Sequence, residues 1–266
     1  MPASIGLPDG VIVITGARTG IGRGLMETFL QEGRQVIAVI RTGSELSVDI
    51  HADQLQTINA DLSDAGALDG LISNLVSVLG ARPIAAMINA AGIITPLGSV
   101  RNIEASAMVS RLILMAVAPT VIANGLVDQM AEGARILNIS TRSALETFPG
   151  LSVYCMSKHA LLSATRSLQL ELPESIAVSS LIPGEVDTAL QEDLRAPDPE
   201  IFPMVEFFRG NRPNLIPVQV VARFIHWVLS DTDRSSFVRD DAWYIYDSSH
   251  HSHWMPAGTP FTYPEP

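Results

Sequence analysis

The chain has 266 residues, with 17 lysines and arginines against 28 aspartates and glutamates, and so carries a formal net charge of −11. A chain of this length forms one domain or at most two, with a core large enough to need no disulfide or metal. The acidic balance argues against a nucleic-acid partner, because phosphate backbones are bound by basic faces. The single cysteine, Cys155, excludes an intrachain disulfide and a cysteine-ligated metal cluster.

The same observations favour a cytoplasmic protein without a membrane partner. Residues 1–10 contain no basic stretch leading into an apolar one, so we expect no signal peptide. The most apolar stretch spans residues 112–127 and contains Pro119, Asn124 and Gly125. A bilayer-spanning helix needs about 20 apolar residues. We therefore expect this stretch to be a buried helix.

Short β-branched runs alternate with longer segments of helical period, which is typical of a parallel sheet with helices on both faces. Most of the runs are apolar throughout, as strands covered on both faces should be. The sequence thus predicts an α/β fold with a doubly wound, seven-stranded parallel sheet. The expected strands are Val11–Thr15, Gln35–Ile40, Gln56–Asn59, Ile84–Asn89, Ala134–Ile139, Ala177–Ile182 and Ala242–Tyr246.

Five segments between these strands have helical spacing: Ile21–Gln31, Asp64–Leu79, Ile103–Met130, Val153–Leu172 and Pro217–Leu229. We expect one domain over residues 1–266. The pattern breaks up over residues 190–217, around four prolines, too late in the chain for a second core. Such insertions over a sheet edge often form substrate lids, so we expect a lid here, followed by a tail at residues 247–266.

The first strand leads into a glycine-rich turn and then a helix. Such a turn lets the backbone approach a pyrophosphate, which the helix N-terminus then binds. A tight turn without a ligand is the alternative, but the position in the first βαβ unit favours a dinucleotide site. The residues expected to contact the dinucleotide are Gly16, Arg18, Thr19, Gly20, Ile21 and Gly22.

The end of the second strand indicates which dinucleotide is bound. A carboxylate at this point accepts hydrogen bonds from a free 2′-hydroxyl, whereas a cation pairs with a 2′-phosphate. Here Ile40 is followed by Arg41, which favours NADP (NADPH), with help from Arg18. A solvated loop arginine is the alternative. Asp61 and Leu62 follow the third strand and would lie beside the adenine, unless Asp61 caps a helix instead.

Tyr154 and Lys158 stand four residues apart, so on a helix they project from one face about one turn apart. A free phenol titrates near pH 10, and an adjacent ammonium stabilises the phenolate. Tyr154 is therefore a candidate acid or base. Taken alone, a Tyr-x-x-x-Lys pair is usually surface decoration, and the surrounding motifs decide the matter.

Those motifs occur in order along the chain: the glycine turn, Asn89-Ala90-Ala91-Gly92, Tyr154 to Lys158, and Pro183-Gly184-Glu185-Val186-Asp187-Thr188. Together they resemble the short-chain dehydrogenase/reductase family, from about residue 10 to 246. The resemblance implies a single Rossmann-type domain, a nicotinamide cofactor, and hydride transfer between a carbonyl and an alcohol.

The resemblance also implies roles for individual residues. Tyr154 would donate the proton, and Lys158 would hold the nicotinamide ribose and tune the phenol. The other expected cofactor contacts are Asn89, Ala90 and Gly92, beside the central sheet, and Pro183, Gly184, Val186 and Thr188, beside the carboxamide and phosphates.

Two positions depart from the family pattern. Where the family places a substrate-binding serine, this sequence has Thr141, with Ser140 beside it, and threonine keeps the hydroxyl. Where the family places an asparagine in the helix after the fourth strand, this sequence has Met115. A thioether cannot position a proton-relay water as an amide does. Asn124 is out of phase with that position and does not replace it. The relay then depends on a backbone carbonyl, or activity is reduced.

Residues 187–199 and Tyr246-Asp247 resemble the sepiapterin reductase and benzil reductase branch, which implies reduction of a diketone or an α-oxo side chain. Residues 150–153 with Phe202, Met204, Phe207 and Phe208 would then line an apolar substrate pocket, or the aromatics would form the core of the lid.

His250, His251 and His253 lie close together in the tail. Imidazoles bind zinc, but carboxylate partners and a rigid helical spacing are absent, so we predict no metal site and expect the tail to dock on a neighbouring subunit. Residues 103–130 and 153–172 are more apolar than one buried face requires, which predicts a homodimer or homotetramer.

The function predicted from the sequence is NADPH-dependent reduction of a small-molecule ketone or diketone, with Tyr154, Lys158 and Thr141 as the catalytic residues. The alternative, suggested by Met115, is a cofactor-binding protein with little turnover that acts as a redox sensor or scaffold.

Overall fold

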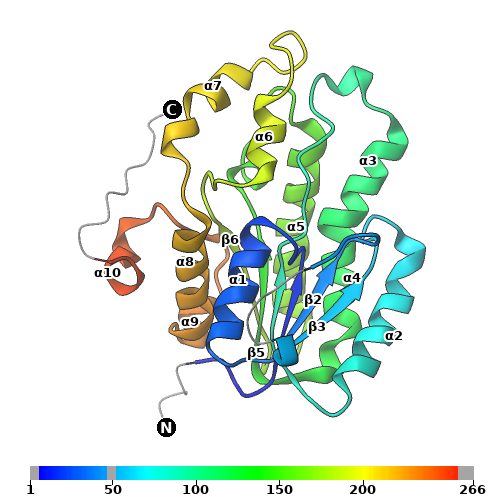
Figure 1. Ribbon diagram of the computed structural model, residues 1–266, viewed down its shortest axis with the longest axis vertical. Helices are drawn as coiled ribbons and strands as arrows, with labels where there is room; N and C mark the ends of the chain where they lie inside the picture. Colours follow the sequence, from blue (N-terminus) through cyan, green and yellow to red (C-terminus); the bar gives the residue numbers. More distant parts are fainter. Residues whose placement is uncertain (1–5, 47–51, 257–266) are drawn as a thin grey trace.

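The protein is described by a computed structural model that covers residues 6–46 and 52–256. Seven parallel strands form one sheet, as predicted (Figure 1). Their order in the sheet is β3-β2-β1-β4-β5-β6-β7. Their bounds are β1 Val11–Thr15, β2 Val36–Ile40, β3 Leu55–Asn59, β4 Ile84–Asn89, β5 Met130–Ile139, β6 Ala177–Ile182 and β7 Ala242–Tyr244. The strand order reverses between β1 and β4, and open α/β sheets bind ligands beside such a switch point.

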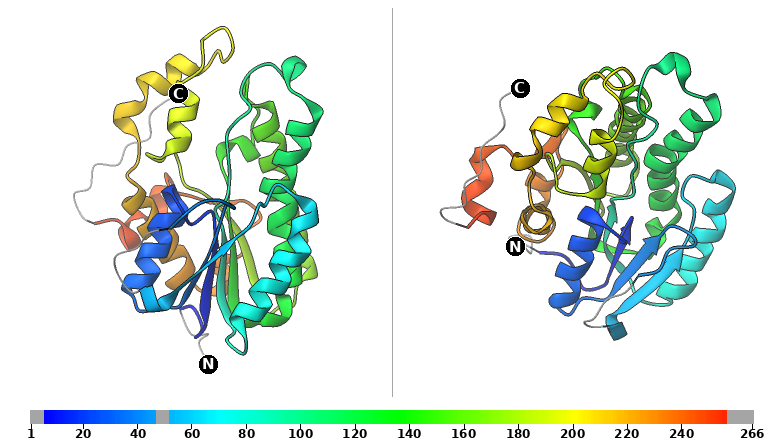
Figure 2. Two further views of the ribbon diagram at one scale, coloured as in Figure 1. Left: turned by 45° about the vertical axis from the view of Figure 1, so that its right-hand side comes forward. Right: turned by 45° about the horizontal axis from the view of Figure 1, so that its top comes forward.

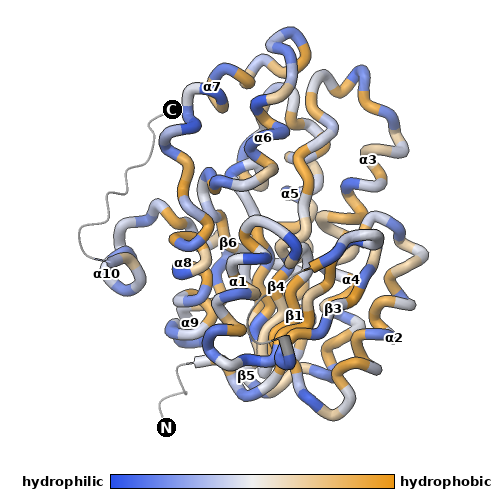
Figure 3. Tube along the Cα trace, in the orientation of Figure 1, coloured by the Kyte–Doolittle hydropathy of each residue, from blue (hydrophilic) through white to orange (hydrophobic). Residues whose placement is uncertain are grey.

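Helices cover both faces of the sheet (Figure 2). On one face α1 (Gly20–Gln31) packs against α8 (Val218–Ser230), and α9 (Arg234–Phe237) follows α8 in the chain. On the other face lie α2 (Leu68–Leu79), the long helix that begins with α3, and α5 (Ser152–Glu171). The central strands are apolar along their length (Figure 3), and the side chains on each face form a separate buried cluster with the helices above them. These two clusters make the sheet a rigid platform for the loops at its carboxyl edge.

The long helix between β4 and β5 has a π-helical turn in its middle. α3 (Ala105–Leu112) passes into this turn at Ile113–Val117 and continues as α4 (Ala118–Gly125). Pro119 has no N–H to donate, so the regular hydrogen-bond ladder cannot run through this region. The helix was predicted to extend to Met130, and this is wrong: it ends at Gly125, and Met130 already begins β5.

The same helix is the only described segment long and apolar enough to cross a membrane by length and composition. It spans Ala105–Gly125 and is therefore longer than the predicted apolar stretch. Along its length it contacts α5, and its α4 part also contacts α2. Met115, Ala118 and Ile122 are buried, whereas Val117 is exposed and α3 has no buried residue, so only one side of the predicted stretch lies in the core.

The segment predicted as a lid forms α6 (Ala189–Arg195) and α7 (Val205–Gly210) beyond the carboxyl edge of the sheet (Figure 2). Phe202, Val205 and Phe208 pack with Leu151 and Cys155 in a third apolar cluster. A Cβ on Gly150 would lie 2.6 Å from the ring of Phe202, so only glycine allows this contact. The lid is thus anchored to the start of α5.

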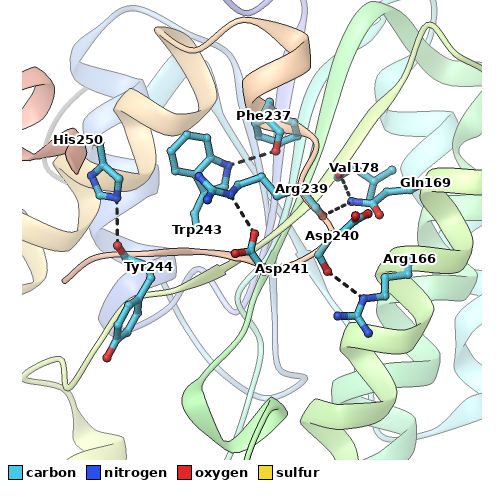
Figure 4. A network of polar contacts seen from close by, with 10 residues as sticks. All are labelled: Arg166, Gln169, Val178, Phe237, Arg239, Asp240, Asp241, Trp243, Tyr244 and His250. Atoms are coloured by element: carbon cyan, nitrogen blue, oxygen red, sulfur yellow. Dashed lines mark hydrogen bonds and ion pairs between the residues drawn. The ribbon is translucent and has the colours of Figure 1, made fainter. Parts of the chain in front are cut away.

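The tail folds back onto its own subunit. α10 (His251–Trp254) brings Trp254 against Phe224 of α8, and Trp254 donates a hydrogen bond of 2.9 Å to His250 Nδ1. His250 in turn bonds the carbonyl of Tyr244 through Nε2 at 3.1 Å (Figure 4). Residues 247–256 therefore pack on their own subunit, docking on a neighbouring subunit stays a prediction, and residues 257–266 lie outside the described part. Within the described residues no cluster of histidine, cysteine or carboxylate groups could hold a metal ion.

Candidate active site

Two adjoining cavities lie at the carboxyl edge of the sheet. The first, the glycine-turn cavity, has a volume of about 420 Å³ and is lined by residues of the glycine turn and the ends of β2, β3 and β4. The second, the tyrosine cavity, has a volume of about 380 Å³ and is lined by Tyr154, Lys158 and Thr141 together with the lid. Both share Ile21, Ala90, Gly92, Thr188 and Leu190 in their walls. One elongated molecule can therefore occupy both.

The glycine turn leaves space for a ligand because side chains are excluded from it. Gly16 has a φ of +71°, and a Cβ there would lie 2.7 Å from the backbone of Ala91. A Cβ on Gly22 would lie 2.5 Å from the carbonyl oxygen of Gly16. Gly16, Arg18, Thr19, Gly20 and Ile21 line the glycine-turn cavity, whereas Gly22 lies behind the turn and holds α1 close to it. This cradle at a helix N-terminus fits a pyrophosphate.

Arg18 and Arg41 are exposed side chains that line the glycine-turn cavity. Asp61 and Leu62 line it as well, as predicted for the adenine end. Asp61 also accepts hydrogen bonds from the backbone N–H and the hydroxyl of Ser63, and these bonds lower the pKa of its carboxyl. Asp61 therefore stabilises the turn after β3 while facing the cavity.

Tyr154 and Lys158 lie on one face of α5, beside the end of β5. The ammonium of Lys158 donates a hydrogen bond of 2.7 Å to the carbonyl of Ile139 and lies 5.9 Å from the centre of the Tyr154 ring. Burial lowers the pKa of Lys158 to about 8. Burial also raises the pKa of Tyr154 to about 12, against a smaller lowering by its hydrogen bond with Thr141. The expectation that Lys158 lowers the pKa of this phenol is therefore wrong for the protein alone, because burial dominates and the only lowering comes from Thr141.

Thr141 is the hydroxyl that contacts Tyr154. It has an extended backbone at the end of β5, and its Oγ1 accepts a hydrogen bond of 3.3 Å from the N–H of Ser143. Ser140 beside it is buried, and its Oγ has no hydrogen-bond partner among the described residues. The structure therefore places the threonine, and not the neighbouring serine, against the phenol.

Asn89 lies beneath the site and lines neither cavity. Its Nδ2 donates to Asn138 Oδ1 at 2.7 Å, and Asn138 donates to Thr165 Oγ1 at 2.8 Å. This buried chain links β4 and β5 to α5, the helix that carries Tyr154 and Lys158. Asn89 thus supports the site from below, whereas Ala90 and Gly92 border both cavities.

Met115 lies in the π-helical turn and is fully buried. A Cβ on Gly92 would lie 3.8 Å from its sulfur and 3.9 Å from Lys158 Nζ, so the thioether and the ammonium flank the same small volume. Asn124 is exposed at the far end of α4. The prediction that Asn124 does not replace the family asparagine agrees with this placement.

Pro183, Gly184 and Val186 line the tyrosine cavity, and Thr188 borders both cavities. Leu151, Met204, Phe207 and Phe208 also face the tyrosine cavity, whereas Phe202 is completely buried in the lid core. The predicted apolar pocket is therefore present, with Phe202 and the predicted Gly150 and Val153 outside its wall.

Several cavity residues were not predicted from the sequence: Arg111 in the glycine-turn cavity, and Arg142 and Tyr244 in the tyrosine cavity. Glu185 and Gln191, which also line the tyrosine cavity, were part of the quoted motifs but were not predicted as site residues. Tyr246 had been noted only for the branch resemblance. Arg111 lies on α3, Gln191 on α6 and Tyr244 on β7, and Arg142 follows β5, so no local spacing connects them. Glu185 could most readily have been recognised as a site residue, because it is an acidic residue directly after the Pro183-Gly184 pair.

Comparison with known proteins agrees with this geometry. Residues 10–199 match the family model of short chain dehydrogenases. The chain is 30% identical to 1-deoxy-11-beta-hydroxypentalenate dehydrogenase of Streptomyces arenae, over 70% of each chain. It is 27% identical to Carbonyl reductase [NADPH] 2 of Sus scrofa, over 84% of this chain and 90% of the relative.

Among solved structures, 4-hydroxyisoleucine dehydrogenase complexed with NADH superposes with a TM-score of 0.72 at 25% identity. The match covers 89% of this chain and 97% of that one. The protein is therefore an oxidoreductase that acts on CH–OH or C=O groups with a nicotinamide cofactor, and it belongs to the short-chain dehydrogenase/reductase family.

Proposed function

We propose that this protein reduces a ketone or diketone carbonyl of a small molecule to an alcohol with NADPH. The observation that carries the proposal is the position of Tyr154, Thr141 and Lys158 in the wall of a mostly apolar cavity that adjoins the glycine turn. A carbonyl compound in the tyrosine cavity would lie beside the phenol, and the apolar walls exclude water from the reacting atoms.

The preference for NADPH is supported by the arginines of the glycine-turn cavity. Arg41 follows β2, no acidic residue stands at the end of that strand, and Arg18 lines the same cavity. Two guanidinium groups suit a 2′-phosphate, which a guanidinium binds through paired hydrogen bonds. The similar proteins do not decide between the cofactors, because one is named for NADPH and another is complexed with NADH. The proposal of NADPH therefore rests on the residues at the end of β2.

Bound NADPH supplies the hydride for the carbonyl carbon. Tyr154 gives its proton to the carbonyl oxygen, and Thr141 donates a second hydrogen bond that orients this oxygen. The high pKa of Tyr154 keeps the phenol protonated at neutral pH, which suits reduction. Lys158, whose pKa is about 8, can return a proton to the phenolate in the same pH range.

The proposal is tested by NADPH oxidation with a panel of aromatic and aliphatic diketones and quinones. We expect turnover with at least one member and a loss of about 10²- to 10⁴-fold in the Tyr154→Phe variant, because general acid catalysis contributes that much. A second candidate function, cofactor binding with little turnover as a sensor or scaffold, is favoured by Met115. Tight NADPH binding without turnover of any compound would support it.

We also propose a homo-oligomer in the cytoplasm. The two helices that we expect to form the interface carry exposed apolar side chains. These are Val109 on α3, Val117 in the π-helical turn, and Met156 and Leu170 on α5, each more than two fifths exposed. Exposed apolar groups on two adjacent helices suit a subunit interface.

A further inference from the structure

Glu185 is a charged group in an apolar setting. Among the described residues that line the tyrosine cavity it is the only carboxylate. Apolar side chains such as Phe148, Leu151, Met204, Phe207 and Phe208 line the same cavity, together with the polar Arg142, Gln191, Tyr244 and Tyr246. The proton transfer proposed above uses Tyr154, Thr141 and Lys158 and leaves Glu185 without a role.

The backbone at Glu185 is fixed by pairing with the end of the lid. The N–H of Ile216 donates to the carbonyl of Glu185 at 2.8 Å, and the N–H of Asp187 donates to the carbonyl of Ile216 at 2.9 Å. Val186 and Ile216 form a parallel bridge between these bonds. The Cα of Glu185 therefore cannot shift without breaking this pairing.

The side chain of Glu185 is oriented by a buried amide. Asn211 Nδ2 donates to Glu185 Oε2, and Asn211 is only 7% exposed. The oxygen of Asn211 is occupied by Asn214, whose Nδ2 donates to it at 2.9 Å. Asn211 must therefore present its NH₂ group to Glu185. No hydrogen bond from a described residue reaches the other carboxylate oxygen, Oε1.

A purely structural link between the lid and this loop would not need a charge. A glutamine at position 185 could accept the same hydrogen bond from Asn211 without the desolvation cost of a carboxylate. That cost is present here, because burial raises the pKa of Glu185 against the opposing effects of Asn211 and Arg142. A held carboxylate with one oxygen still able to accept is suited to a hydrogen-bond donor of a ligand.

We propose that Glu185 binds a hydroxyl group of the substrate, so that the ketone reduced at Tyr154 carries a hydroxyl on an otherwise apolar body. A neutral donor fits better than an ammonium, because Arg142 lines the same cavity and its charge acts on Glu185. Glu185 is then a residue that determines specificity, and the inference rests on the proposed function.

The probes are the ortho, meta and para hydroxyl isomers of 1-phenyl-1,2-propanedione, each paired with its methoxy analogue, which keeps an acceptor but cannot donate. Two quantities are measured for each pair: kcat/KM with NADPH, and Kd by calorimetry in the presence of oxidised NADP, where no hydride is available. We expect at least one hydroxyl isomer to be preferred about 10- to 100-fold, the range of a hydrogen bond to a charged group.

Glu185→Gln should reverse this preference in favour of the methoxy analogue. Asn211 would donate to the oxygen of the new glutamine, so its NH₂ group would face the ligand and could only donate a hydrogen bond. Glu185→Asp is the second variant. It keeps the charge on a side chain one methylene shorter, so it should reduce the preference for the hydroxyl isomer. Glu192→Gln, an exposed glutamate of α6 outside the cavity wall, is the matched control and should keep the wild-type ratio.

The outcomes separate the two proposals. Equal values for every hydroxyl and methoxy pair in the wild type, or an unchanged preference in both Glu185 variants, would overturn the role of Glu185 while turnover still supported the reductase. A Glu185-dependent difference in Kd without turnover would support the role of Glu185 and count against the reductase. If the wild type shows neither a binding preference for the hydroxyl isomers nor turnover of any compound, both proposals are overturned.

Discussion

The sulfur of Met115 and the ammonium of Lys158 flank Gly92, at 3.8 Å and 3.9 Å from the point where a Cβ on that residue would lie. Among the described residues, the ammonium of Lys158 donates one hydrogen bond, to the carbonyl of Ile139. A thioether accepts hydrogen bonds only weakly. The buried ammonium is therefore poorly solvated on this side, in agreement with its lowered pKa of about 8.

Met115→Asn should raise kcat, chiefly above pH 8, with little change in KM. An amide beside Lys158 can hold a water that resupplies protons to Tyr154 when protons are scarce. The pH profile of kcat measures this effect. Met115→Leu is the control, because leucine keeps the apolar volume and adds no hydrogen-bonding group. Thermal stability is measured in parallel, since an unpaired buried amide costs about 1 to 3 kcal/mol. A folded Met115→Asn protein with the wild-type profile would show that this resupply does not limit turnover.

The stability of the fold should depend on Lys158 at alkaline pH. The folded pKa is about 8 against 10.5 for the free side chain, so the unfolded state binds more protons between these values. The free energy of unfolding therefore rises with pH between about 8 and 10.5, because the folded state loses the proton of Lys158 first. Relative to Lys158→Met, the wild type should gain roughly 2 kcal/mol between pH 8 and pH 10 in urea unfolding.

Tyr154 has the opposite effect at higher pH. Its folded pKa of about 12 lies above the free value of 10, so its contribution is complete below pH 10 and is lost as pH rises toward 12. The window from pH 8 to pH 10 therefore isolates Lys158. A flat difference between wild type and Lys158→Met across this window would mean that the ammonium is not desolvated in solution.

Arg41→Ala should raise KM for NADPH and leave NADH kinetics nearly unchanged. A charge-assisted hydrogen bond to a phosphate is worth about 1.5 to 3 kcal/mol, which corresponds to roughly 10- to 100-fold. Initial rates with the two cofactors measure the effect. Arg101→Ala is the matched control, because Arg101 is exposed and lies outside the cavity walls. Equal losses with both cofactors would show that Arg41 does not read the 2′-phosphate.

The exposed apolar residues of α3 and α5 should hold the subunits together. Light scattering at micromolar concentration should give the mass of a dimer or tetramer, and Val109→Glu with Leu170→Glu should lower it by placing charges in the interface. A monomeric wild type would contradict the predicted assembly.

Most strands were predictable from the sequence because their runs of buried apolar residues stand between polar turns; β3 is the exception, since it is largely polar and exposed. β5 is longer than predicted, since Met130–Gly133 is only half apolar and resembles a loop. The π-helical turn was not predictable, because it depends on how the backbone adapts to Pro119 within a packed helix. Motif residues such as Tyr154 were visible as local patterns. The grouping of Glu185 with Asn211 and Arg142 was not, because these residues come from three separate segments that meet only in the folded chain.

The central claim is hydride transfer from NADPH to a ketone with the proton supplied by Tyr154. The most direct measurement uses NADPH with deuterium at both C4 positions of the nicotinamide, and mass spectrometry of the alcohol formed from the diketone panel. We predict one deuterium on the carbinol carbon with the wild type, and about 10²- to 10⁴-fold less labelled alcohol with Tyr154→Phe over the same time. Bound NADPH without any labelled alcohol from the wild type, or equal labelling by Tyr154→Phe, would contradict the account.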